Sequence, residues 1–144
     1  MNQLIAVVYV AVSMACLWTV SATPACAGSS KAAESLTTVA PLMTQQLVAD
    51  SSKEVVMLTV TYAPGASSSP HRHDAQVFVF MLEGTLTMQI RGHAAVTLHP
   101  GETFYESPGD IHAVSANASH VAPAKFLVVM IKDKTRPVSR PVAR

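Results

Sequence analysis

Short apolar segments recur between residues 41 and 133 and are separated by turns rich in glycine and proline. Some of these segments alternate apolar and polar side chains, and others are dominated by β-branched and aromatic residues, as is typical of β-strands. The pattern predicts strands at residues 41–48, 55–62, 76–82, 85–91, 94–98, 103–106, 112–115 and 125–131. Short strands at this spacing, without helical periodicity, predict an all-β fold, an antiparallel barrel or jelly roll.

The N-terminal part of the chain has a different pattern. Residues 4–20 are almost continuously apolar, and Ala25 and Ala27 place small residues where signal peptidase requires them. Residues 1–27 are therefore predicted to be a secretory signal peptide. Two alternatives remain open, an uncleaved membrane anchor and a lipoprotein acylated at one of the two cysteines.

The remainder of the chain has the size of one domain. Residues 28–40 are predicted to be a polar spacer, residues 41–133 a β-barrel and residues 134–144 a basic, solvated C-terminal tail. Both cysteines of the chain lie in the predicted signal peptide, so the mature protein would contain no disulfide. We expect a periplasmic or secreted protein that does not associate with the membrane after signal cleavage. Ten basic and nine acidic residues give no indication of nucleic-acid binding.

Three histidines are candidate metal ligands. His71 and His73 are two residues apart, so in extended backbone both side chains project from the same face. His112 follows a Pro-Gly turn, and closure of a barrel can bring it to the pair. Imidazole nitrogens bind transition metals at about 2.0–2.1 Å. The sequence thus predicts a site for a divalent metal, which can be Fe, Mn, Ni, Zn or Cu.

The segments around these histidines resemble the cupin superfamily, in particular its small single-domain bacterial members. The first cupin motif, G-x5-H-x-H-x3/4-E-x6-G, matches at Gly65, His71, His73 and Gly84. The second motif, G-x5-P-x-G-x2-H-x3-N, matches at Gly101, Gly109 and His112, and its Pro and Asn are each shifted by one place, to Pro108 and Asn117. The resemblance covers roughly residues 55–131 and implies a cupin double-stranded β-helix (jelly roll).

One position departs from the first motif. Its carboxylate position falls on Val77, and the polar neighbour Gln76 would reach the same side only if a β-bulge shifted the strand by one residue. The resemblance therefore implies ligation by His71, His73 and His112. Gln76 is kept as a candidate fourth ligand.

Glu106 is the candidate catalytic residue. It ends an otherwise apolar strand, close to the turn that leads to His112. Three roles are open for it: a solvent-facing carboxylate, an acid or base in the pocket, or an acceptor that orients a histidine N–H.

Two classes of function are consistent with these residues. The first is an exported metal-dependent enzyme, of dioxygenase or isomerase type, that acts on a small molecule. The second is a non-catalytic protein of the cell envelope that binds a metal or a small ligand. Fold and motif do not select a reaction, and the orientation of Glu106 is the feature that distinguishes the two classes. Unpaired strand edges would also allow a homodimer.

Overall fold

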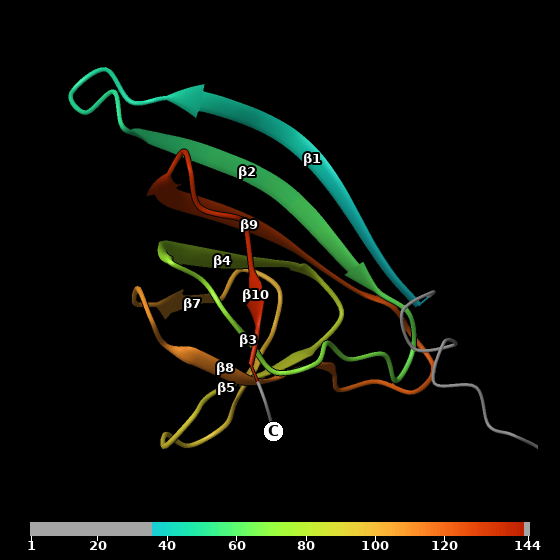
Figure 1. The fold of residues 1–144 in the computed structure, drawn as a ribbon. Helices are drawn as coiled ribbons and strands as arrows, with labels where there is room; N and C mark the ends of the chain where they lie inside the picture. Colours follow the sequence, from blue (N-terminus) through green and yellow to red (C-terminus); the bar gives the residue numbers. More distant parts are fainter. Residues whose placement is uncertain (1–35, 143–144) are drawn as a thin grey trace, which may run out of the picture.

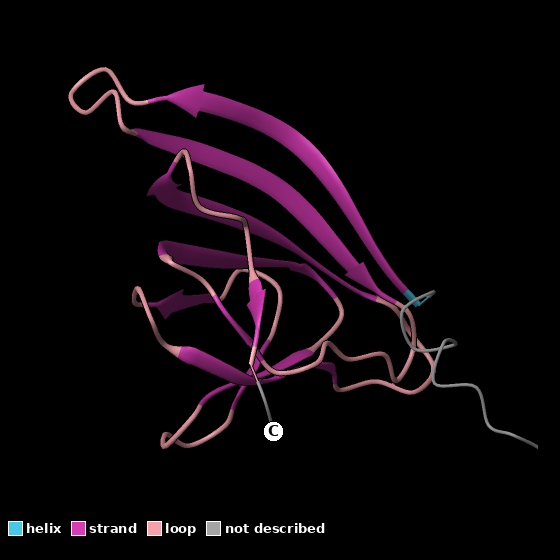
Figure 2. Ribbon diagram, viewed as in Figure 1, coloured by secondary structure: helices cyan, strands magenta, loops and turns pink. Residues whose placement is uncertain are grey.

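The structure is a computed structural model and describes residues 36–142. Its regular secondary structure is almost entirely β-strand (Figure 2). The strands are β1 (Thr37–Gln46), β2 (Lys53–Tyr62), β3 (His71–Arg72), β4 (Ala75–Glu83), β5 (Leu86–Ile90), β6 (Val96–Leu98), β7 (Thr103–Glu106), β8 (Ile111–Asn117), β9 (Ala124–Asp133) and β10 (Arg140–Pro141).

The strands form two five-stranded sheets, and neighbouring strands in both are antiparallel. One sheet has the order β1-β2-β9-β4-β7 and the other the order β10-β3-β8-β5-β6. In Figure 1 the first sheet curves over the second, and the side chains between them form the core. The predicted all-β jelly roll is confirmed.

Strand alternation accounts for the core. In β9, Phe126, Val128 and Met130 are buried, whereas the residues between them are only partly buried. Strands β2 and β4 alternate in the same way, so all three strands turn one row of apolar side chains inward. Full burial of such a side chain contributes roughly 1.5–3 kcal/mol. These three strands therefore present a largely apolar surface to the interior of the molecule.

Asn117, the shifted asparagine of the second motif, connects the loop after β2 with the loop between β8 and β9. Its side-chain amide donates hydrogen bonds to the carbonyl oxygens of Ala63 (3.0 Å) and Ala122 (2.8 Å). Its side-chain oxygen accepts one from the backbone N–H of Ser119 (2.9 Å). Because Asn117 is only 4% exposed, these bonds form away from water and fix the loops at the end of β8.

Both ends of the described chain differ from the expected arrangement. Strand β1 begins at Thr37, inside the segment expected to be a spacer. The C-terminal segment (residues 134–142) was expected to be solvated, but β10 pairs with β3 and brings it back to the barrel. An ion pair of 2.8 Å between Arg140 and Asp74 also attaches it. The predicted signal peptide lies outside the described residues.

Within residues 36–142, no helix has both the length and the apolar character needed to cross a membrane.

Candidate metal centre

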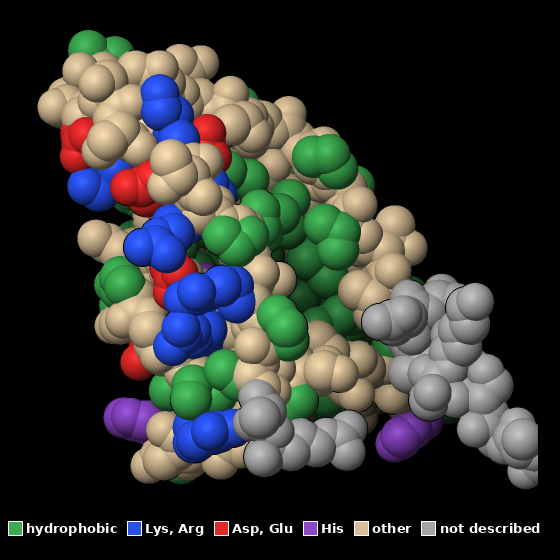
Figure 3. Space-filling model, in the orientation of Figure 1, with side chains coloured by type: hydrophobic (Ala, Val, Ile, Leu, Met, Phe, Trp, Pro, Cys, Tyr) green, Lys and Arg blue, Asp and Glu red, His purple; other side chains and the backbone are tan. Residues whose placement is uncertain are grey.

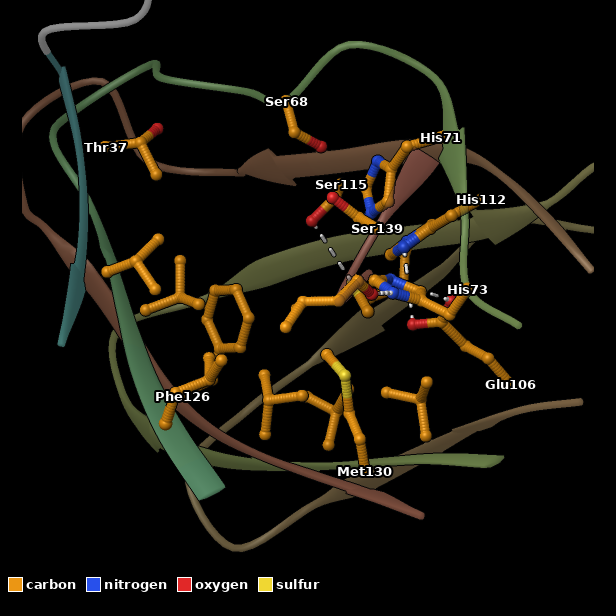
Figure 4. A pocket seen from close by; sticks show the side chains of 18 of the residues that line it. Thr37, Ser68, His71, His73, Glu106, His112, Ser115, Phe126, Met130 and Ser139 are labelled. Carbon is orange, nitrogen blue, oxygen red and sulfur yellow. Dashed lines mark hydrogen bonds and ion pairs between the residues drawn. The ribbon is translucent and has the colours of Figure 1, made fainter. Parts of the chain in front are cut away.

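The sheet that contains β3 and β8 brings the three histidines together. His71 in β3 pairs directly with His112 in β8, and His73 follows β3 immediately. The ring centres of His71 and His73 are 4.9 Å apart, and those of His71 and His112 are 5.1 Å apart (Figure 4). One ring nitrogen from each histidine lies within 4.8 Å of the other two. Ligand nitrogens that share one ion at about 2.0–2.1 Å lie roughly 3–3.5 Å apart, so a bound cation would draw the three rings closer together.

Backbone carbonyls hold two of the imidazole rings in a defined tautomer. His71 Nδ1 lies 2.9 Å from the carbonyl oxygen of Ser69, and His73 Nδ1 lies 2.5 Å from that of Val138. A carbonyl oxygen only accepts hydrogen bonds, so each Nδ1 must carry the proton and donate it. In a neutral ring the lone pair is then on Nε2, which is the arrangement that metal-binding histidines adopt.

The third imidazole lies beside a carboxylate. Glu106 Oε1 lies 3.3 Å from His112 Nδ1. Nε2 of the same ring is buried and has no hydrogen-bond partner in the described part of the chain. A buried ring nitrogen without a partner carries a desolvation cost, which a bound cation would remove. The donor set therefore fits a metal ion.

Burial keeps two of these imidazoles neutral. It lowers the pKa of His73, and it lowers the pKa of His112 to about 3, with positive charge on His71 and His73 acting in the same direction. Protonation of a buried ring would place a charge in a medium that solvates it poorly. At neutral pH both rings are therefore in the form that binds metals.

Glu106 faces the interior and not the solvent. The residue is 2% exposed, and its Oε2 lies 3.9 Å from His73 Nε2 without a hydrogen-bond partner among the described residues. Burial raises the pKa of the Glu106 carboxyl to about 7, and the negative charge of Asp110 contributes to the increase. The candidate catalytic residue thus lies directly beside the histidines, as Figure 4 shows.

The structure does not bring Gln76 to the histidines. Strand β4 pairs regularly with β9 from Ala75 to Met81, so the bulge that would turn Gln76 inward is absent there. Gln76 is exposed on the outer face, and Val77 is 1% exposed on the inner face. The prediction of Gln76 as a fourth ligand is therefore wrong. Val77 pairs across the strands with Glu106 in β7, so a carboxylate from the neighbouring strand lies beside the position where the motif has its own.

A family model described as a cupin domain matches residues 58–130, half of the 144-residue chain. This protein belongs to the cupin family. The matched segment contains His71, His73, Glu106 and His112, so the family assignment covers the complete candidate site. No curated protein sequence matches the cupin.

Several solved structures share its fold. An oxalate oxidase in complex with the substrate analogue glycolate is 24% identical, with a TM-score of 0.58 over 74% of this chain and 55% of its own. The polyketide cyclase RemF from Streptomyces resistomycificus is 24% identical, with a TM-score of 0.58 over 76% and 72%. The DMSP lyase DddQ from Ruegeria pomeroyi DSS-3 is 22% identical, with a TM-score of 0.53 over 61% and 43%. The cupin thus spans about half the length of the oxidase and of the lyase, and the similarity establishes the fold.

The histidines and Glu106 lie at one end of a cavity of about 330 Å³ inside the barrel (Figure 4). The remaining wall is mostly apolar and comes from the inner faces of β2, β4 and β9. The C-terminal segment closes part of one side through Val138, Ser139 and Pro141. The cupin therefore has a polar end with candidate ligands and an apolar body within one pocket.

Two features of the site could not be found among the sequence motifs. The acceptors for His71 and His73 are the main-chain carbonyls of Ser69 and Val138, and every residue type carries such a group. No motif marks these carbonyls, and the C-terminal segment that contains Val138 was expected to be solvated. The hydrogen bond between the hydroxyl groups of Tyr62 and Ser115 in the cavity wall (3.0 Å) also arises only from the fold.

Proposed function

We propose that this cupin binds a divalent transition metal through Nε2 of His71, His73 and His112. The observation that carries the proposal is the anchoring of the three rings, in which each Nδ1 faces an acceptor and the buried Nε2 of His112 has no partner among the described residues. Iron, manganese, nickel, zinc and copper all remain candidates, because imidazole binds several of these metals and occupancy follows their availability. The metal content of protein purified without an affinity tag tests the proposal.

A metal in this position would supply Lewis-acid or redox chemistry at the polar end of the cavity. Three neutral imidazoles leave the positive charge of the ion uncompensated and coordination positions open to water or a ligand. Glu106 would accept a hydrogen bond from His112 Nδ1, and its second oxygen, which lies toward His73, is available to hold or transfer a proton.

The position of Glu106 favours an enzyme over a passive binding protein. A metal-storage or ligand-binding protein does not need a proton carrier, whereas this chain buries a carboxyl group beside the histidines in the cavity. We therefore propose a small-molecule enzyme of dioxygenase or isomerase type. The similar structures include an oxidase, a cyclase and a lyase, so the fold is compatible with several reactions.

Replacing Glu106 by glutamine tests the role of the carboxylate. The amide preserves the shape of the side chain but removes its charge and its ability to accept a proton. We expect the metal affinity to fall by about 10–100-fold, as is typical when a partner that orients a metal-binding histidine is lost. Competition with a chromophoric chelator measures this change.

The matched control for Glu106→Gln is Glu83→Gln, because Glu83 is exposed at the end of β4. Oxygen uptake with phenols, diketones and thiols is measured in parallel on iron-, manganese- and nickel-loaded protein. A Glu106→Gln variant that retains both the wild-type metal affinity and any oxygen consumption would contradict the assigned role.

We also propose that the protein is exported. The apolar stretch at residues 4–20 and the small residues at Ala25 and Ala27 support cleavage after Ala27. N-terminal sequencing of protein from the cell envelope fraction should give a start at Gly28. A chain that retains Met1 would favour a membrane anchor instead.

A further inference from the structure

The body of the cavity is walled by apolar side chains from three adjacent strands. The residues of β2, β4 and β9 that line the cavity all lie on the inner side of the same sheet. This wall consists of Leu58, Val60, Val77, Val79, Phe126, Val128 and Met130. In Figure 4, Phe126 lies on the opposite side of the cavity from the histidines. The polar end and the apolar end are therefore at opposite sides of the cavity.

The cavity offers no charged or amide partner away from the histidines and Glu106. Among the described residues that line it, none is Lys, Arg, Asn or Gln. The other polar side chains are hydroxyls, of which Ser115 already pairs with Tyr62, and Ser68 lies close to His71 in Figure 4. A second charged group inside the cavity would therefore be desolvated against a mostly aliphatic wall with only hydroxyl groups as partners, and this is unfavourable.

We infer that the cavity binds a small molecule with one oxygen-containing head group, such as a carboxylate, and an uncharged apolar body about the size of one ring. The head group faces the three histidines. The inference rests on the proposed metal site for the head group and on the wall composition for the body. A volume of about 330 Å³ is near the lower end of the roughly 300–1,000 Å³ of small-molecule sites. The ligand is thus limited to about one substituted ring. Dicarboxylates with a ring between their two carboxylates are excluded as good ligands, because only one of these carboxylates can face the histidines.

The surface of the molecule is consistent with the entry of such a ligand. Thr37 and Val39 of β1 line the cavity on one side, and Val138 of the C-terminal segment lines it on another. Figure 3 shows a hollow with hydrophobic walls on this face, beside a band of Lys and Arg side chains. An apolar ligand would contact hydrophobic side chains all the way from the hollow to the inner wall of the cavity.

The test compares three carboxylates that present the same head group to zinc-loaded protein: acetate, benzoate and terephthalate. Isothermal titration calorimetry should give a Kd for benzoate about 10–100-fold lower than for acetate, because the ring leaves water for an apolar wall. Terephthalate should bind at least about 10-fold more weakly than benzoate, since its second carboxylate has no partner.

Two adjacent residues of β9 supply matched variants. Val128 faces the cavity and Val129 lies on the outer face. Val128→Phe should fill the cavity and weaken benzoate binding by at least about 10-fold without changing the zinc content, whereas Val129→Phe should change neither. If circular dichroism shows that Val128→Phe does not fold, Val128→Leu replaces it, with a smaller expected loss.

The outcomes separate this inference from the metal proposal. Zinc-loaded protein that binds benzoate no better than acetate, or terephthalate as well as benzoate, would overturn the inference and leave the metal site intact. If the protein retains no zinc, the metal proposal fails, and neutral p-cresol is titrated into metal-free protein. Binding that Val128→Phe abolishes would then support the apolar pocket alone, and absence of binding would overturn it.

Discussion

Replacing His112 by alanine should leave the protein without a stably bound metal. The substitution removes one of three candidate nitrogen ligands from a site in which, among the described residues that line the cavity, Glu106 is the only carboxylate. We expect the affinity to fall by more than about 100-fold, or about 3 kcal/mol, because loss of a ligand exceeds the 10–100-fold effect typical of its supporting partners. Inductively coupled plasma mass spectrometry of untagged protein, followed by chelator competition, measures the change.

The control for His112→Ala is His93→Ala, because His93 is exposed in the turn after β5 and does not line the cavity. That variant should retain the metal content of the wild type. Circular dichroism of both metal-free variants separates loss of the site from loss of the fold. Equal metal content in wild type and His112→Ala would remove the proposed centre and, with it, the proposed enzyme chemistry.

The sequence was sufficient to predict the jelly roll and the convergence of the histidines. Apolar, β-branched and aromatic segments between turns identified β2, β4 and β9, and the alternation of residues 85–91 identified β5. The spacing of His71 and His73 placed both side chains on one face. Their meeting with His112 was implied by the cupin resemblance and is produced in the structure by the antiparallel pairing of β3 with β8.

The fourth position of the site depended on details that the sequence does not carry. Whether Gln76 or Val77 faces the cavity is decided by a single residue of register, and local propensity does not favour either one. The regular pairing of β4 with β9 selects Val77, and the pairing of β4 with β7 then brings Glu106 beside it. A carboxylate on a different strand cannot be found by a motif that reads along one strand.

The contribution of the C-terminal segment was hidden for a different reason. Its carbonyl at Val138 accepts the hydrogen bond that orients His73. A main-chain carbonyl has no residue signature, so basic composition alone suggested a solvated tail. The return of the segment depends on β10 and on the ion pair between Arg140 and Asp74, a contact between residues that are distant in sequence.

Replacing Gly84 by alanine should destabilise the protein more than a glycine substitution in an open turn. Gly84 lies between β4 and β5 with φ of +77°, and L-residues pay about 1–2 kcal/mol for a left-handed conformation. An added Cβ would also lie 2.2 Å from the carbonyl oxygen of Pro123 and 3.0 Å from Cα of Ala124. Both are backbone atoms at the start of β9, so rotation of a side chain cannot relieve the contact.

The total loss for Gly84→Ala should be about 3 kcal/mol or more, since overpacking adds roughly 1–3 kcal/mol to the conformational cost. Gly92→Ala is the matched control, because Gly92 has a similar φ of +86° and a Cβ there would meet no atom within 4 Å. Urea denaturation of metal-free protein gives the free energy of unfolding of both variants. The difference between them isolates the contact with the start of β9, the strand that supplies Phe126, Val128 and Met130 to the cavity wall. Equal destabilisation of the two variants would show that backbone conformation alone accounts for the glycine at position 84.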